Sequence, residues 1–132
     1  MKPGPKEPDS ELDRLAHQVI GAAIEVHRQL GPGLLEGVYE KALCIEFELR
    51  GITFQTQSGV GITYKGRPVG RGKMDLLVGD RLIVELKAVE KLAPIHLAQM
   101  ISYLRMTKRA LGLLINFNVP VLKEGIRRVV LS

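Results

Sequence analysis

The sequence predicts an α/β protein in which helices pack against one mixed β-sheet. Two amphipathic helical segments occupy the first 50 residues, and short β-type runs separated by turn-forming residues begin at about residue 52. Further along, an apolar strand, a helix and a second apolar strand follow one another, which is the order of a crossover unit with parallel strands. A single sheet with helices packed against it accommodates all of these segments.

Length and composition indicate one globular domain. The chain has 132 residues, of which 45% are hydrophobic and 25% charged, close to ordinary globular usage. We expect one domain over residues 10–132, preceded by a flexible tail over residues 1–9 that holds three prolines and no signal-peptide core. No stretch approaches the roughly 20 apolar residues that span a bilayer, so we expect a cytoplasmic protein without a membrane partner.

The net charge is +5, from 19 Lys and Arg against 14 Asp and Glu, and this excess favours an anionic partner such as nucleic acid. The single cysteine, Cys44, cannot form an internal disulfide and has no neighbouring metal ligand. We interpret Cys44 as a core thiol.

The first helix is predicted to start at Ser10, which has the S-x-x-[DE] spacing of a capping box with Asp13. Glu25 and His27, near its end, are interpreted as part of a polar helix face. Gly31-Pro32-Gly33 should end the helix, because glycine frees the backbone and proline cannot continue it. The apolar residues recur every three or four positions over about five turns, at Leu12, Leu15, Val19, Ala23, Val26 and Leu30.

A second helix should follow almost at once and end near Gly51, where a left-handed residue is favoured. Its predicted buried stripe consists of Leu35, Val38, Ala42, Ile45 and Leu49.

The β-region is predicted as an antiparallel meander of three strands, near residues 59–64, 68–78 and 82–88. Its turns are Lys65-Gly66-Arg67 and Gly79-Asp80-Arg81. Beyond it we expect a helix from Pro94 to about Lys108, a buried strand over residues 110–117 and an edge strand over residues 126–131.

Two charges interrupt the apolar run "LIVELKA" of residues 82–88. A three-residue loop at 79–81 would pair Val78 with Leu82, and would set Asp75 opposite Glu85 and Lys73 opposite Lys87. By strand alternation, the charges would share one face of the sheet. The other face would be wholly apolar, formed by Met74, Leu76, Val78, Leu82, Val84 and Leu86.

Two facing carboxylates repel each other unless a cation lies between them. Oxygen ligands suit Mg²⁺ or Mn²⁺ better than zinc, so Asp75 and Glu85 are candidate ligands of a divalent ion. Lys87 would then orient a water or offset charge on a phosphate. The alternative is a solvated sheet face with surface ion pairs.

The helix after this strand carries His96, Gln99 and Tyr103 on one stripe, beside a packing stripe of Leu97, Ala98, Ile101 and Leu104. The Gln99 amide and the Tyr103 hydroxyl could reach a phosphate or the attacking water. Taken singly, each also fits an ordinary polar residue of a helix surface.

Together these residues resemble the active site of the PD-(D/E)XK nuclease superfamily. Asp75, then Glu85-Leu86-Lys87, then Q-x-x-x-Y ending at Tyr103 follow its order, and the last motif is similar to that of bacterial recombination exonucleases. Gly33 to Tyr39 spells G-x-x-E-x-x-Y, the motif of a family of small bacterial and archaeal proteins assigned to this superfamily. The resemblance runs from about residue 16 to 131, with Met74 in place of the superfamily's proline.

The resemblance implies a restriction-endonuclease-like fold, with a mixed central sheet and flanking helices, and a metal-dependent nuclease that uses Mg²⁺ or Mn²⁺. Glu36 has an alternative explanation, because a carboxylate in the first turn of a helix is stabilised by the helix dipole. Tyr39, His96 and Lys73 are candidate supporting residues. The implied metal ligands are Asp75, Glu85, the backbone carbonyl of Leu86 and Glu36, with Lys87 as the catalytic lysine and Gln99 and Tyr103 in support.

The implied substrate is nucleic acid, DNA in preference to RNA. No separate recognition domain is visible, so specificity should come from a homodimer or a partner protein. The alternative is a nuclease-fold module without useful turnover that binds nucleic acid or a protein. A candidate phosphate-binding surface consists of Lys41, Arg50, Lys65, Arg67, Arg71 and Lys73.

Overall fold

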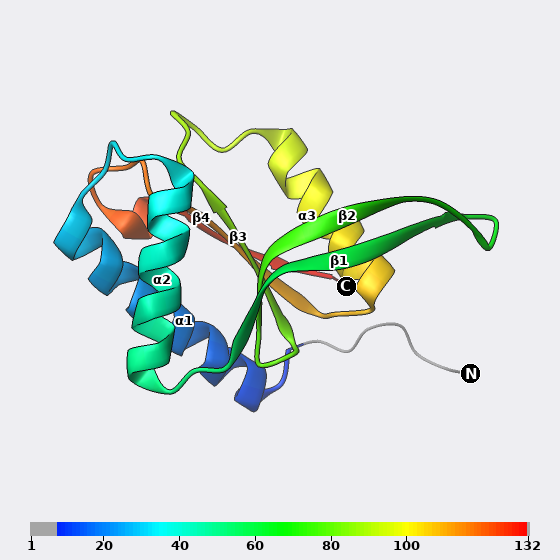
Figure 1. Ribbon diagram of the computed structural model, residues 1–132, viewed down its shortest axis with the longest axis horizontal. Helices are drawn as coiled ribbons and strands as arrows, with labels where there is room; N and C mark the ends of the chain where they lie inside the picture. Colours follow the sequence, from blue (N-terminus) through cyan, green and yellow to red (C-terminus); the bar gives the residue numbers. More distant parts are fainter. Residues whose placement is uncertain (1–7, 132) are drawn as a thin grey trace.

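The computed structural model describes residues 8–131, so most of the tail predicted over residues 1–9 lies outside the described residues. The fold is α/β, as predicted, and residues 8–131 form one five-stranded mixed sheet and three α-helices (Figure 1). Among residues 8–131, none of the helices is long and apolar enough to cross a membrane. The elements in chain order are α1 (Ser10–Leu30), α2 (Glu36–Arg50), β1 (Phe54–Tyr64), β2 (Arg67–Val78), β3 (Leu82–Lys87), α3 (Pro94–Thr107), β4 (Leu111–Asn116), the 3₁₀ helix η1 (Leu122–Gly125) and β5 (Ile126–Val130).

The strands lie in the sheet in the order β1-β2-β3-β4-β5. Strands β3 and β4 are parallel and are joined through α3, which confirms the predicted crossover unit, and the other neighbours are antiparallel. All six residues of β4 are buried, while β5 pairs only with β4 and forms the predicted edge strand.

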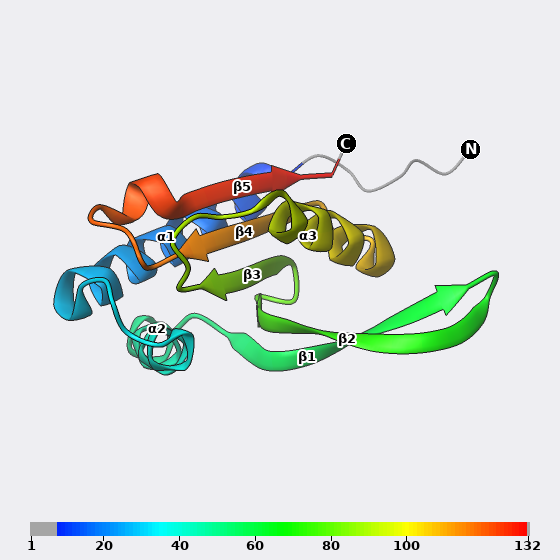
Figure 2. The same ribbon diagram turned by 90° about the horizontal axis from the view of Figure 1, so that it is seen from above.

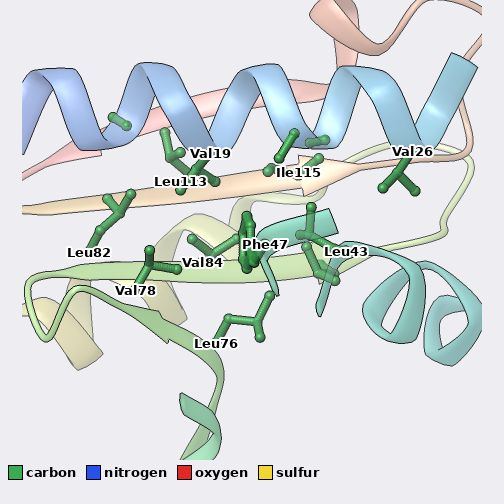
Figure 3. Close-up of a cluster of buried hydrophobic side chains, with 14 of the residues drawn as sticks. Val19, Val26, Leu43, Phe47, Leu76, Val78, Leu82, Val84, Leu113 and Ile115 are labelled. Atoms are coloured by element: carbon green, nitrogen blue, oxygen red, sulfur yellow. The ribbon is translucent and has the colours of Figure 1, made fainter. Parts of the chain in front are cut away.

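Both faces of the central strands β3 and β4 are buried. One face packs against α1 and α2, and Figure 3 shows Val19 of α1 and Phe47 of α2 beside strand residues such as Val84. The opposite face packs against α3, where Ile83 contributes to a second core with Met100. The alternative of a solvated face is therefore wrong for the central strands, because helices cover both sides.

Helix α1 has the predicted length but is capped by Asp9 instead of Ser10. The Asp9 carboxylate accepts a hydrogen bond from the Leu12 amide at 2.8 Å and pairs with Arg81 at 2.9 Å. The hydrogen bond from Arg81, followed by that from Leu12, lowers the pKa of Asp9 to about 2. Asp9 therefore also joins the start of the helix to the loop between β2 and β3.

His27 is buried, so its interpretation as part of a polar helix face is wrong. Its Nε2 lies 2.7 Å from the Val119 carbonyl, and its ring lies 6.4 Å from that of Phe117. Cys44 packs half-buried against the same core, and burial raises the pKa of its thiol.

The predicted buried stripe of α2 is wrong. Its buried residues are Tyr39, Leu43 and Phe47, because these include the two largest apolar side chains of the helix, which bury the most area. Tyr39 stacks on Phe117 with ring centroids 4.5 Å apart. The residues predicted to be buried are largely exposed, at 80% for Leu35, 42% for Val38, 57% for Ile45 and 77% for Leu49, with Ala42 partly buried.

The β1–β2 hairpin is longer than predicted and leaves the sheet. Strand β2 pairs with β3 only over residues 76–78, whereas its pairing with β1 continues from Val78 to Arg67. Figures 1 and 2 both show this hairpin projecting beyond the rest of the molecule. We call residues 59–73 the β-arm.

The alternation of β2 breaks where the β-arm begins. Leu76 lies on the predicted apolar face, which packs under α1 and α2. Met74 packs instead in the core beneath α3, so the prediction that Met74 shares this face is wrong. The cause lies in β1, where Gln57 adopts a φ of 53° between the pairs Thr56–Leu76 and Ser58–Met74. A left-handed residue in one strand rotates the ribbon that follows it.

Candidate active site

The site is built on the hairpin of β2 and β3, whose loop has the predicted three residues, 79–81. Val78 pairs with Leu82, Leu77 with Ile83 and Leu76 with Val84, which confirms the predicted register. The backbone ladder ends there, so Asp75 and Glu85 occupy the next positions, where the two strands separate.

Asp75 and Glu85 link β2 to β3 by reciprocal hydrogen bonds, in which each side-chain carboxylate accepts from a backbone amide of the other strand. The Asp75 amide donates to Glu85 Oε1 at 3.0 Å, and the Leu86 amide donates to Asp75 Oδ2 at 2.9 Å. The two carboxyl groups therefore lie side by side, and each has one oxygen fixed by a backbone amide.

Glu85 is only 3% exposed, and its pKa is raised to about 8. Burial is the main cause, and the negative charge of Asp75 is the second. The Asp75 amide and the positive charge of Lys87 act in the opposite direction but are weaker. Without a cation, this site therefore favours a proton on Glu85 at neutral pH.

The backbone of Leu86 also faces Asp75. An extended residue directs its N–H and C=O to the same side of the strand, and the Leu86 N–H reaches Asp75. The Lys87 carbonyl accepts from Phe117 on the other side, as strand alternation requires. The half-buried Lys87 side chain is close enough to both Glu85 and Glu36 to lower their pKa values.

Glu36 stands in the first turn of α2, within electrostatic reach of the hairpin. Burial raises the pKa of Glu36, the charge of Asp75 raises it further, and Lys87 lowers it. Residues 8–131 nevertheless contain no group of three or more His, Cys, Asp and Glu side chains arranged to hold a metal ion. Glu36 therefore faces the pair without completing a three-carboxylate cluster.

Tyr39 lies in the core and not among the acidic side chains. Its hydroxyl donates to the Gly31 carbonyl at 2.6 Å and accepts from the Leu34 amide at 3.1 Å. These bonds fix the turn that delivers Glu36, and Gly33 in that turn has a φ of 99°. The G-x-x-E-x-x-Y pattern thus corresponds to a turn, a carboxylate and a tyrosine that anchors the turn.

The three polar residues of α3 are placed differently from one another. His96 Nδ1 accepts from the Ala93 amide at 3.0 Å and caps the helix. Gln99 is exposed, whereas Tyr103 is 8% exposed and belongs to the α3 core. Hydrogen bonds within residues 8–131 join none of these three side chains to Asp75, Glu85 or Lys87.

The packing stripe predicted for α3 is correct in part. Leu104 is buried, and Leu97 and Ile101 are partly buried against the same core. Ala98 is exposed, because Met100 and Tyr103 occupy the face that meets the sheet.

The six predicted phosphate-binding cations do not form one cluster. Arg50 is paired with Glu46 at 2.6 Å, and Lys41 lies on the exposed side of α2. Lys73 is exposed on the β-arm and does not face Lys87, because β2 has left β3 before this point. The β-arm carries the remaining cations, Lys65, Arg67 and Arg71.

The sequence interpretation missed Asn116, which is 2% exposed and pairs with Lys87 in the parallel ladder. Its Oδ1 accepts from the Val89 amide at 3.0 Å, and its Nδ2 donates to the Val89 carbonyl at 2.9 Å. Asn116 therefore fixes the chain as it leaves β3, beyond Lys87. The available signal was one amide residue inside an otherwise apolar strand.

The donor chemistry fits a magnesium-type ion. Each carboxylate uses one oxygen for a backbone amide, which leaves Asp75 Oδ1 and Glu85 Oε2 for a ligand. With the Leu86 carbonyl these are hard oxygen donors, which Mg²⁺ and Mn²⁺ bind together with several waters. A bound cation would also supply the positive charge that the two adjacent carboxylates require.

The chain matches a known protein family. A family model described as the PD-(D/E)XK nuclease superfamily matches residues 13–129. Searches of curated proteins and of solved structures found no significant match.

Proposed function

Since the chain belongs to the PD-(D/E)XK nuclease superfamily, whose nucleases generally use divalent metal ions, we propose that it is a metal-dependent nuclease that hydrolyses phosphodiester bonds in DNA. The reciprocally bonded carboxyl groups of Asp75 and Glu85 carry this proposal. They lie side by side, next to Lys87, at the point where two strands of the sheet separate.

In this proposal, Asp75, Glu85 and the Leu86 carbonyl would hold Mg²⁺ or Mn²⁺, with Glu36 as an additional ligand. When bound, the ion supplies Lewis-acid polarisation of the phosphodiester and activation of water. The GxxExxY assignment is the finer part of the proposal, and the Gly33–Glu36–Tyr39 turn supports it.

The side chains of this chain would carry the other tasks. The Lys87 ammonium donates hydrogen bonds to the attacking water or to a phosphate oxygen, and so offsets the charge that develops at phosphorus. Water adds to phosphorus and gives up a proton, the bond to the leaving oxygen breaks, and that oxygen takes up a proton. Gln99 and Tyr103, on the neighbouring helix, would contact the substrate strand or position the segment of β2 that carries Asp75.

Cleavage of supercoiled and linear DNA in Mg²⁺ or Mn²⁺ tests the proposal. We expect Lys87→Ala to lower the rate by about 100-fold or more, as removal of a transition-state donor does. Asp75→Ala should lower it at least as much, because it removes a metal ligand. Lys123→Ala, at an exposed lysine of η1, is the matched control and should keep the wild-type rate. Equal background cleavage by the wild type and both site variants would exclude the proposal.

The second candidate is a nuclease-fold module that binds a partner without useful turnover. The exposed apolar residues of α2 favour it, because they offer a surface for a protein partner or a second copy of the chain. Calorimetric titration with Mn²⁺ separates the two functions. Binding that is lost in Asp75→Ala and Glu85→Ala favours the enzyme, and the absence of such binding in the wild type favours the module.

A further inference from the structure

The β-arm has a charge pattern unlike that of the rest of the chain. From Gln57 to Met74 the sequence contains no acidic residue, while Lys65, Arg67, Arg71 and Lys73 are all exposed. The chain as a whole carries 14 acidic and 19 basic residues, so this segment concentrates positive charge without compensation. A polyanion is the partner that such a surface fits.

The β-arm also has few side chains for its length. Each of four consecutive cross-strand pairs contains one glycine: Gly59–Lys73, Val60–Gly72, Gly61–Arg71 and Ile62–Gly70. Each pair therefore presents only one side chain. Glycine within a strand often marks a place where another backbone or a ligand approaches closely.

The glycines divide the arm into a basic and an apolar face. Lys73 and Arg71 lie opposite Gly59 and Gly61, and the Arg71 guanidinium spreads over Gly59, where Nη2 lies 2.6 Å from the position of an added Cβ. On the other face, Val60 is buried in the α3 core. The apolar face therefore anchors the base of the arm, and the basic face is free to bind.

The tip of the arm adds exposed apolar groups to the cations. A two-residue turn, Lys65-Gly66, has positive φ at both positions, and the flanking Tyr64 is 64% exposed. Lys65 Nζ lies 5.5 Å from the centre of the Tyr64 ring, and Val69 is 62% exposed. Such side chains can contact thymine methyl groups and sugars, whereas the cations contact phosphates.

The dimensions select the kind of nucleic acid. At roughly 3.3 Å per residue the arm extends about 20 Å, and the major groove of B-DNA, about 12 Å wide, admits a two-stranded ribbon. The major groove of A-form RNA is too deep and narrow for side chains to read. A single strand offers no groove.

We propose that the β-arm is a DNA-binding element that lies in the major groove of duplex DNA and holds the duplex while Asp75 and Glu85 meet the backbone. Strand β2 joins the two functions directly, because Lys73 and Arg71 precede Asp75 by two and four residues. The inference rests on the proposed nuclease function for its substrate, but it concerns binding, which can be measured without turnover.

The test uses the full chain and a 20-base-pair DNA duplex with Ca²⁺ in place of Mg²⁺, read by fluorescence anisotropy. Lys65→Ala combined with Arg67→Ala should weaken duplex binding by about tenfold or more. It should also reduce the magnitude of the slope of log K against log salt concentration by about 2, because each phosphate contact contributes roughly 0.9 to that slope. Replacing residues 63–69 by Asn-Gly, which joins Ile62 to Gly70 in their existing pair, should have at least the same effect.

The matched control is Arg14→Ala combined with Lys123→Ala, which removes two exposed cations from α1 and η1 and should leave the affinity unchanged. Methylation of guanine N7, which lies in the major groove, should interfere with binding. Unfolding curves will show whether the variants are folded.

The outcomes separate this inference from the proposed function. Duplex binding that depends on the arm, without any cleavage in Mg²⁺, supports the inference and counts against the nuclease. If the wild type cleaves DNA but binds the duplex no more tightly than the arm variants do, the result supports the nuclease and overturns the inference. The inference is also overturned if the arm variants weaken binding to single strands, double-stranded RNA or anionic vesicles as much as they weaken binding to the duplex. The arm would then be a general polyanion binder.

Discussion

Glu85 Oε1 and the Asp75 amide are 3.0 Å apart, and Glu85 is buried beside the Asp75 carboxylate. The bond fixes the orientation of Glu85 but does not neutralise the negative charge that two adjacent carboxylates share. In the folded protein the pKa of Glu85 is therefore raised from 4.5 to about 8.

This shift predicts that the metal-free protein loses stability as pH rises from about 4.5 to about 8. In this pH window Glu85 keeps its proton in the folded protein but has lost it in the unfolded protein, so proton binding favours the folded state. Each tenfold difference in proton affinity between the two states changes the free energy of unfolding by about 1.4 kcal/mol. The penalty is absent below pH 4.5 and complete above pH 8. Urea unfolding in EDTA at several pH values measures it.

Glu85→Gln should remove this component of the pH dependence, since its amide oxygen can still accept from Asp75 without titrating. Glu124→Gln, at an exposed glutamate of η1, is the control and should retain the wild-type profile. Identical profiles for the wild type and Glu85→Gln would show that Glu85 does not titrate differently in the folded state.

Tyr39→Phe should lower the free energy of unfolding by about 1–2 kcal/mol, the value of two ordinary hydrogen bonds. The variant keeps the stacked ring but loses the bonds to the Gly31 carbonyl and the Leu34 amide. Tyr64→Phe, on the exposed arm, should be neutral. Equal stability of the two variants in guanidinium titrations would mean that the Tyr39 hydroxyl does not hold the turn before Glu36.

Gly72→Ala should destabilise the base of the β-arm by about 1–3 kcal/mol, as overpacking does. A Cβ at this position would lie 2.5 Å from Tyr103 Oη and 2.9 Å from Cζ. Gly70→Ala is the matched control, because nothing lies within 4 Å of its added Cβ. Tyr103→Phe should recover part of the loss in a double-mutant cycle, and strict additivity would show that the two positions do not touch.

Most of the fold could be predicted because local signals and tertiary packing agree. The register of the hairpin followed from the length of its loop, and the parallel pairing of β3 with β4 followed from the helix between them. The adjacency of Asp75 and Glu85 follows from the same register.

Three features could not be predicted, because each depends on tertiary contacts. Nothing in the spacing around Gln57 indicates that it takes a positive φ, which moves Met74 to the other core. The packing of Tyr103 on Gly72 depends on where α3 crosses β2. The hydroxyl of Tyr39 finds its partners in a turn whose course the sequence does not define.

Helix α2 has more apolar residues than one buried face can hold. Because Phe47 is fully buried and Ile45 and Leu49 are mostly exposed, Phe47→Ala should cost about 3–5 kcal/mol. Ile45→Ser combined with Leu49→Ser should change the free energy of unfolding by less than about 1 kcal/mol, as surface substitutions do. Urea unfolding at several protein concentrations measures both. A loss for the Ser pair that grows with protein concentration would show that a second copy covers this side of the helix, because only the associated state would then bury these residues.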